Sequence, residues 1–417
     1  MTLLRSLHKK YLENWISDIV KIAIITPEYP PYVSGGVGSY NYELVKKLTE
    51  KGVEVIVIAP SRSEDEVRYC FGNHCKCYYL RTPSLRPVYF YFQMYNSERV
   101  RRIIEKERPD IIQLNAGSDI LIKTLKDLLK SVDIKVVLVF HGSPSPYNRY
   151  WDSLKHIDVV DLAWTTTQLV YAKMEKILGE DTLSYVDVAV HVSKHVMYYN
   201  ISCYEGLRSL KNVVIYPGID VHKYASQTKD TSALLNKRYK FLVFGARLMR
   251  YKGVVQLVKA FMITKKRNPY LYLQIFGDGP LRSYVLKATH EYTGVFYYGK
   301  VPREFFLKKL AISDILVHPS FYEAAPMVVI EAAVLGKLVI AHEAPWSEEF
   351  VKSFNLGVTV DVTDIERFAK TLLDLTNEEN YKKYLWEKSE RKNKLIATFS
   401  SDRMARDYVE LYKKLLA

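Results

Sequence analysis

Two carboxylates, Glu323 and Glu331, stand in the segment 320–336, SFYEAAPMVVIEAAVLG, with seven residues between them. The preceding segment, 312–319, is apolar and rich in β-branched residues, which predicts a buried parallel strand ending at Pro319. Open α/β sheets bind ligands at the carboxyl ends of their strands. We therefore expect both carboxylates to face a ligand at this edge of a sheet.

A helix is expected to follow, from about Pro326 to Leu335, because proline suits the first helical turn and Gly336 suits the position beyond the last one. The first amides of a helix have no intrahelical acceptor and carry the positive end of its dipole. A phosphate would fit against the amides of Ala325, Met327 and Val328. The alternative is a half-buried helix with a surface glutamate at each end.

Two cations lie in a similar position earlier in the chain. Arg247 follows the predicted strand Phe241–Phe244 in the loop GARLMRYKG, and Lys252 precedes Gly253 in the same loop. A forked guanidinium and an ammonium can both reach one anion there. Two positive charges beside a diphosphate would stabilise it as a leaving group. The alternative is a solvated pair of cations on a loop.

The amino-terminal half offers two weaker candidates. Gly35 and Gly36 follow the first predicted strand, and their lack of side chains lets the backbone approach a ligand closely. The loop is not a dinucleotide-binding fingerprint, because its glycine spacing differs and no acidic residue ends the next strand. His141 follows the predicted strand Val136–Phe140 and either contacts a ligand or is a satisfied polar group.

Composition limits the classes of function. The chain has 417 residues, 48% of them apolar, which is enough for two domains with their own cores. A net charge of +14 favours anionic partners, but the charges are scattered and no nucleic-acid-binding motif appears. The sequence shows neither a secretory signal nor an apolar stretch that could span a membrane. We therefore expect a cytoplasmic protein, free or peripheral on a membrane.

Three cysteines, Cys70, Cys75 and Cys77, lie with His74 in the segment CFGNHCKC. Four soft ligands are compatible with zinc, but their spacing matches no common zinc motif. Reduced thiols or one local disulfide are the favoured interpretation. We expect no metal here.

Two segments could meet a membrane. Residues 1–18 carry apolar side chains at helical spacing with a basic flank, so this amphipathic extension packs on the protein or lies on an anionic membrane surface. Val88–Tyr95, VYFYFQMY, is aromatic enough that part of it must be covered, by the core, an acceptor or a membrane.

The pattern of alternating strands and helices restarts after the turn Tyr216–Asp220. It predicts an α/β protein of two Rossmann-like, doubly wound domains, the first over 19–218 and the second beginning at 219.

Together these residues resemble the retaining nucleotide-sugar glycosyltransferases of sequence family four, also known as glycosyl transferases group 1, over nearly the whole chain from Lys21. The pair of glutamates and the Arg–Lys loop are the specific part of the resemblance. The motifs that carry it are GGV at 35–37, HG at 141–142, YPGID at 216–220, GARLMRYKG at 245–253, IFGDGP at 275–280 and HPSFYEAAPMVVIEAAVLGK at 318–337.

The resemblance implies the GT-B architecture, in which two Rossmann-like domains face each other across a cleft. The second domain would cover 219–400, and a carboxyl-terminal helix over 401–417 would cross back to the first domain.

The resemblance also implies roles for single residues. The catalytic group would comprise Glu323 beside the transferred sugar, His141 against that sugar, and Arg247 and Lys252 on the diphosphate. Glu331 would bind the ribose hydroxyls of the donor, and Gly35 and Gly36 would lie near the diphosphate or acceptor. The amides of Ala325, Met327 and Val328 would bind sugar hydroxyls and phosphate. Gly277 and Val301 would lie beside the base. The family commonly has Gly-Phe-Gly where this chain has Ala324, Ala325 and Pro326, so the sugar pocket would be narrower.

The expected reaction is transfer of a sugar from a nucleoside diphosphate sugar to a hydroxyl of a glycan, glycolipid or lipid-linked sugar. In this family the leaving diphosphate is thought to accept the acceptor's proton, so the anomeric configuration would be retained and neither a metal nor another cofactor is expected. The alternatives are a sugar-nucleotide epimerase, a glycoside phosphorylase, or a non-catalytic protein that binds sugar nucleotides.

Overall fold

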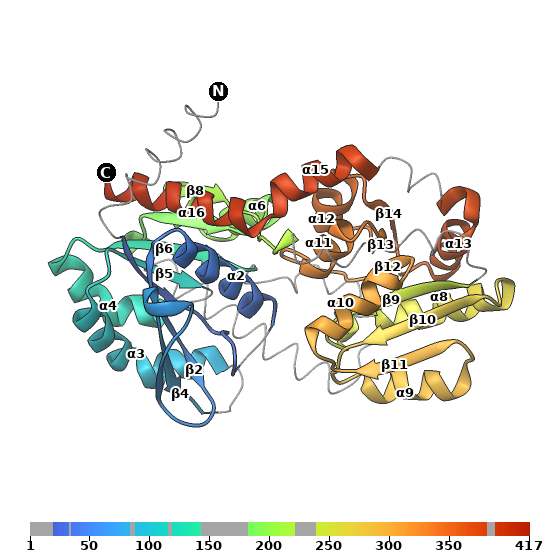
Figure 1. Cartoon of the computed structure of the whole chain (residues 1–417), viewed down its shortest axis with the longest axis horizontal. Coiled ribbons are helices and arrows are strands. Elements are labelled where there is room, and N and C mark those ends of the chain that lie inside the picture. Colours follow the sequence, from blue (N-terminus) through green and yellow to red (C-terminus); the bar gives the residue numbers. More distant parts are fainter. Residues whose placement is uncertain are drawn as a thin grey trace. The chain divides into compact units, whose positions relative to one another are not determined.

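The computed structural model describes residues 20–32, 35–83, 88–115, 119–142, 182–221, 239–381 and 388–417. The predicted extension 1–18 lies outside these residues. The described residues form two compact units: the first runs to Gly218 and includes Ser401–Ala417, and the second runs from Ile219 to Ser400. In Figure 1 the strands of the first unit are blue to green and those of the second are yellow to orange.

The first unit contains an eight-stranded sheet in the order β3-β4-β2-β1-β5-β6-β7-β8. All neighbouring strands run parallel except the edge strand β3, which is antiparallel to β4. The strands that follow β1 in the chain lie on one side of it, and those that follow β5 lie on the other side of the sheet. The switch point of this sheet therefore lies between β1 and β5. The strands are β1 (Lys21–Ile25), β2 (Glu54–Ser61), β3 (Glu66–Tyr69), β4 (Cys75–Arg81), β5 (Ile111–Asn115), β6 (Lys135–Phe140), β7 (Val188–His191) and β8 (Lys211–Val214).

The second unit contains a six-stranded parallel sheet in the order β11-β10-β9-β12-β13-β14. Counted from β9, this is the 3-2-1-4-5-6 order of a Rossmann fold, and its switch point lies between β9 and β12. The strands are β9 (Lys240–Gly245), β10 (Leu271–Phe276), β11 (Val295–Gly299), β12 (Ile315–His318), β13 (Leu338–His342) and β14 (Gly357–Val360). The prediction of two Rossmann-like α/β domains is therefore confirmed.

Helices connect the parallel strands in both units (Figure 1). The connecting helices include α2 (Gly36–Glu50), α3 (Val88–Glu107), α4 (Asp119–Ser131), α6 (Lys194–Cys203), α8 (Val254–Arg267), α9 (Arg282–Glu291), α10 (Arg303–Ile312) and α11 (Met327–Val334). Helices α13 (Ile365–Thr376), α15 (Lys388–Phe399) and α16 (Ser401–Leu416) follow the last strand, β14. No described helix is long and apolar enough to cross a membrane.

The strands form because they are apolar and covered on both faces. In β1 and β2, every residue after the first is buried, the pattern of parallel strands between layers of helices. The aromatic run at the start of α3 is only partly covered: Phe92 is fully buried in the core, whereas Met94 and Tyr95 are 52% and 61% exposed.

The starts of α2 and β12 bear on the site. α2 begins at Gly36, so Gly36 and Gly38 lie in its first turn. The Glu28 carboxylate accepts a hydrogen bond from the Gly38 amide at 3.2 Å, which satisfies this early turn from outside the helix. β12 covers only Ile315–His318, because α10 extends to Ile312.

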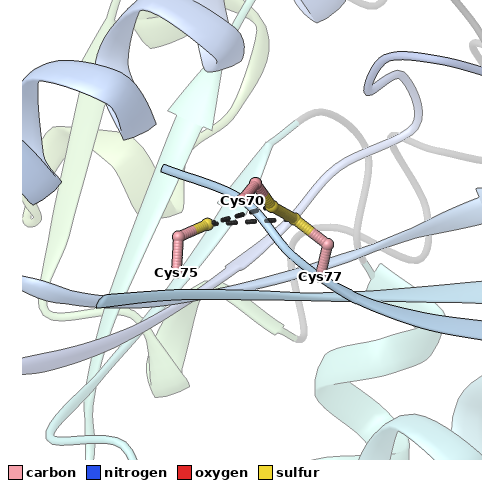
Figure 2. Close-up of side chains that lie close together, drawn as sticks. All are labelled: Cys70, Cys75 and Cys77. Atoms are coloured by element: carbon pink, nitrogen blue, oxygen red, sulfur yellow. Dashed lines mark hydrogen bonds between the residues drawn. A yellow bond between two sulfur atoms is a disulfide. The ribbon is translucent and has the colours of Figure 1, made fainter. Parts of the chain in front are cut away.

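The cysteine segment forms a hairpin of β3 and β4 and contains one local disulfide, Cys70–Cys77 (Figure 2). Cys75 is a buried free thiol. His74 is exposed and does not belong to the cluster of three sulfurs.

Helix α16 belongs to the first unit, where it packs on α2. The hydroxyls of Tyr408 and Tyr40 lie 2.6 Å apart, and the Tyr412 hydroxyl donates to the Gln113 side chain at 2.5 Å. All four side chains are buried. These bonds attach the end of the chain to the first sheet.

Replacing Tyr412 with Phe should therefore lower the thermal unfolding midpoint of the full chain. The substitution leaves the buried Gln113 oxygen without this donor, which costs about 1–3 kcal/mol. Tyr198→Phe is the matched control, because Tyr198 is 66% exposed on α6 and should tolerate the change. Equal midpoints for both variants would contradict the assignment.

Candidate active site

The predicted charged residues gather at the carboxyl ends of the strands in the second sheet. Arg247 and Lys252 lie in the loop after β9, and Glu323 lies in the loop after the neighbouring strand β12. These two strands flank the switch point, where open α/β sheets bind ligands. The fold therefore brings together the cations and the carboxylate that the sequence analysis singled out.

Glu323 is held by two partners. Its Oε1 lies 2.6 Å from Lys252 Nζ and 2.6 Å from His318 Nε2. All three side chains are largely buried. Burial alone would raise the pKa of Glu323, but the positive charge of Lys252 and the His318 contact hold it well below its usual range. Glu323 is therefore a fixed, ionised carboxylate.

A backbone hydrogen bond and a close backbone contact join these two loops. The amide of Phe321 donates to the Tyr251 carbonyl at 2.9 Å. Gly253 has a φ of 73°, and a Cβ there would lie 2.1 Å from the Pro319 carbonyl oxygen. Only glycine fits this left-handed, closely packed position, so the Lys252–Glu323 contact depends on it.

The amino end of α11 offers free amides beside Glu323. The structure places Pro326 at the cap position, and the amide of Val329 donates to the Pro326 carbonyl at 2.9 Å. Within 239–381 and the other described ranges, the amides of Ala325, Met327 and Val328 have no acceptor. They can therefore donate to an anion or to hydroxyl groups.

Arg247, unlike Lys252, has no ion-pair partner in the described part of the chain. Its side chain is exposed, and the described part of the chain gives its guanidinium neither an ion-pair nor a hydrogen-bond partner. The loops after β9 and β12 thus present one free cation, Arg247, and one cation, Lys252, that is paired with Glu323.

Glu331 is 2% exposed and forms an ion pair with Arg303, the first residue of α10. A buried carboxylate needs such a partner, because desolvation penalises its charge. Sequence reasoning missed Arg303. A glutamate in an otherwise apolar helix does indicate that a cation must pair with it. The sequence alone could not show which Lys or Arg is that partner.

Gly277 and Val301 follow the neighbouring strands β10 and β11. A Cβ on Gly277 would lie 1.8 Å from the Ala246 carbonyl oxygen, so packing inside this unit already explains the glycine. The Tyr297 hydroxyl donates to the Gly277 carbonyl at 3.0 Å, which holds the loop in place.

The glycines and His141 belong to the first unit, at the carboxyl ends of β1 and β6. A Cβ on Gly35 would lie 2.3 Å from the Glu28 carboxylate, whereas a Cβ on Gly36 would meet nothing within 4 Å. Gly35 thus makes room for Glu28, and only Gly36 leaves open space for another group.

A chain of polar side chains connects His141 to the start of α2. His141 Nε2 lies 3.3 Å from Asn115 Oδ1, and Asn115 donates to Asn41 at 3.0 Å. Asn41 in turn donates to Thr26 at 2.8 Å. Asn41 and Asn115 were not predicted as site residues. Asn115 does stand out as a polar residue at the end of an apolar strand at the switch point.

Burial lowers the pKa of His141 to about 3, and its imidazole and the Tyr40 ring form a T-shaped contact with the ring centroids 4.6 Å apart. Burial also lowers the pKa of His191 to about 4. Both histidines are therefore neutral near pH 7, and His141 can act there as a hydrogen-bond donor or acceptor but not as a cation.

These pKa shifts predict acid sensitivity. Between pH 6.5 and about 4, the unfolded chain binds protons at His141 and His191 that the folded chain does not, so stability should fall as the pH falls. The slope is at most about 1.4 kcal/mol per pH unit for each histidine. Unfolding midpoints from pH 7 to 5 should fall less steeply in His141→Asn than in the wild type. A control variant, His290→Asn at an exposed site on α9, should show the same fall of the unfolding midpoint with pH as the wild type. A fall in His141→Asn as steep as in the wild type would refute the prediction.

Arg303→Ala should destabilise the chain by about 1–3 kcal/mol, because it leaves the Glu331 charge buried without this partner. The expected loss is smaller than for a fully buried pair, since Arg303 is 45% exposed. Lys287→Ala removes an exposed i,i+4 ion pair in the same unit and should change the free energy of unfolding little. Equal effects of the two substitutions in denaturant titrations would show that Arg303 is not needed.

Comparison with known proteins matches both halves of the chain. A family model described as Glycosyltransferase Family 4 matches residues 34–223, and one described as Glycosyl transferases group 1 matches residues 226–392. An uncharacterized glycosyltransferase of Methanocaldococcus jannaschii is 22% identical over 410 residues, which cover 95% of this chain and 99% of that protein.

Solved structures share the fold over nearly the same length. Sucrose-phosphate synthase from Thermosynechococcus elongatus superposes with a TM-score of 0.74 at 17% identity, covering 95% of this chain and 99% of its own. The Anabaena protein HepE, in complex with UDP and glucose, superposes with a TM-score of 0.65 at 16% identity, covering 95% of this chain and 100% of its own. Family models for both halves, together with this shared fold, show that the chain belongs to the GT-B glycosyltransferases, with a family 4 domain followed by a group 1 domain.

Proposed function

We propose that this glycosyltransferase uses a nucleoside diphosphate sugar as donor and retains the configuration of the anomeric carbon. The observation that carries the proposal is the arrangement at the switch point of the second sheet. There, Arg247, the Lys252–Glu323 pair and the free amides at the start of α11 meet at one strand edge. These groups are complementary to a diphosphate joined to a sugar.

The diphosphate would bind to positive charge from three sources. Arg247 has a guanidinium available for forked hydrogen bonds, Lys252 supplies an ammonium, and the α11 amides supply the helix dipole. Together they would stabilise the charge that develops on the leaving diphosphate. We propose that this set replaces the divalent metal that other transferases use.

Glu323 is unsuited to moving a proton. Its pKa is held low by Lys252 and His318, so it remains a carboxylate through the reaction. A fixed negative charge beside the sugar would instead stabilise positive charge on the anomeric carbon and orient the sugar. The proton of the acceptor hydroxyl would pass to the leaving diphosphate oxygen while the new glycosidic bond forms on the same face.

Glu331 would accept hydrogen bonds from the ribose hydroxyls. A carboxylate offers about four acceptor positions, so its bond to Arg303 leaves capacity for further donors. His141, neutral near pH 7, would hydrogen-bond the sugar from the first unit. The acceptor is proposed only by class, as a hydroxyl of a glycan, glycolipid or lipid-linked sugar.

The test is release of nucleoside diphosphate from UDP-, GDP- and ADP-sugars in the presence of a metal chelator. One donor should be turned over. Lys252→Ala should slow turnover by about 10²–10³-fold, because it removes a charge that stabilises the leaving group. Glu331→Gln should mainly raise the KM for the donor. Lys287→Ala and Glu366→Gln, at exposed sites in the same unit, are the matched controls and should behave as wild type.

Each part of the proposal can fail separately. Loss of activity with the chelator would contradict the metal-free mechanism. An inverted product, seen in the anomeric proton couplings by nuclear magnetic resonance, would contradict retention. Cleavage of a glycoside that requires inorganic phosphate and no nucleotide would replace the proposal with a phosphorylase.

A further inference from the structure

The three cysteines of the β3–β4 hairpin form a cluster that the glycosyltransferase function does not use. Cys75 and Cys77 are two residues apart on β4, so their side chains lie on the same face of that strand. Cys70 directly follows β3, and its amide donates to the Cys75 carbonyl at 2.9 Å. The hairpin therefore brings three sulfur atoms together from both of its strands (Figure 2).

The sulfur atoms lie within reach of a single ion. All three Sγ atoms are within 4.8 Å of one another. Cys75 Sγ is 3.3 Å from Cys70 Sγ and 3.8 Å from Cys77 Sγ. Thiolates bound to one zinc ion at about 2.3 Å in tetrahedral geometry lie about 3.8 Å apart. The Cys75–Cys77 pair already has this separation, the Cys75–Cys70 pair must move about 0.5 Å apart, and the Cys70–Cys77 disulfide must open.

Most of the cluster is shielded from water. Cys75 and Cys77 are 1% and 0% exposed, and Cys70 is half-buried.

We propose that, in the reduced protein, Cys70, Cys75 and Cys77 bind one thiophilic metal ion such as Zn²⁺. The disulfide Cys70–Cys77 is then the oxidised, metal-free form of the same site. The fourth coordination position would be open to a water molecule. The site belongs to the first unit and is independent of the proposed transfer reaction.

The redox step is balanced by a dithiol reductant. Two electrons pass from the dithiol to the Cys70–Cys77 bond by thiol–disulfide exchange, so this bond breaks, the dithiol closes to a disulfide, and its two protons pass to the two cysteine sulfurs. Metal binding then displaces the protons of the thiols that become ligands. Exchange with an oxidised dithiol would conversely re-form the Cys70–Cys77 disulfide, reduce that partner and release the ion.

The test is a metal titration of the full chain after reduction with a phosphine and removal of the reductant without oxygen. Cd²⁺ serves as the probe, because its bonds to thiolates give an ultraviolet charge-transfer band, and Zn²⁺ competition with a chromogenic chelator gives the affinity. We expect one equivalent of Cd²⁺ for the reduced wild type and none for the oxidised protein.

Two variants separate this site from adventitious thiol binding. Cys75→Ser keeps the hairpin and removes one ligand, so its Zn²⁺ affinity should fall at least 100-fold. Cys203→Ser removes the one cysteine outside the cluster, on α6, and should bind as wild type. Failure of the reduced wild type to bind, or equal affinity in Cys75→Ser, would overturn the proposal. Retained thermal stability of Cys75→Ser shows that any lost binding is not caused by unfolding.

Discussion

The contact of Glu323 with Lys252 and His318 is the interaction on which the second unit's site depends. It joins the loop after β9 to the strand end and loop of β12, at the switch point of a Rossmann-like sheet. A buried carboxylate with two partners is costly to disturb, so both loops are fixed before any ligand arrives. It also fixes the protonation state of Glu323, which limits the chemistry that this residue can perform.

The central parallel strands of the two units share the 3-2-1-4-5-6 order, but the residues at the two switch points differ. The second unit places charges there, which suit a diphosphate. The first unit places there a neutral chain of hydrogen bonds, from the buried side chains of Thr26, Asn41 and Asn115 to the half-buried His141. Neutral donors and acceptors suit hydroxyl groups better than phosphate. The proposed division of roles, with diphosphate bound by the second unit and sugar contacted by the first, rests on this difference in polarity.

Much of this could be predicted from the sequence. The strands, and the position of Arg247, Lys252 and Glu323 after the strand ends, follow from local patterns. Runs of apolar residues and turn residues indicate the secondary structure of the segment in which they occur. The missed partners are Arg303 and His318. Both contact their glutamates through tertiary packing, which no local spacing encodes. Gly35 and Gly277 were assigned to ligands, but their close neighbours are Glu28 and Ala246, and such packing is visible only in three dimensions.

The measurement that tests the central claim most directly is calorimetric titration of the full chain with a nucleoside diphosphate and with the corresponding nucleoside. If the loops after β9 and β12 and the start of α11 form a diphosphate site, the diphosphate should bind at least tenfold more tightly than the nucleoside. Arg247→Ala should remove most of that difference, because it deletes the uncommitted cation. Equal affinity for both compounds, or a difference that Arg247→Ala leaves intact, would contradict the account.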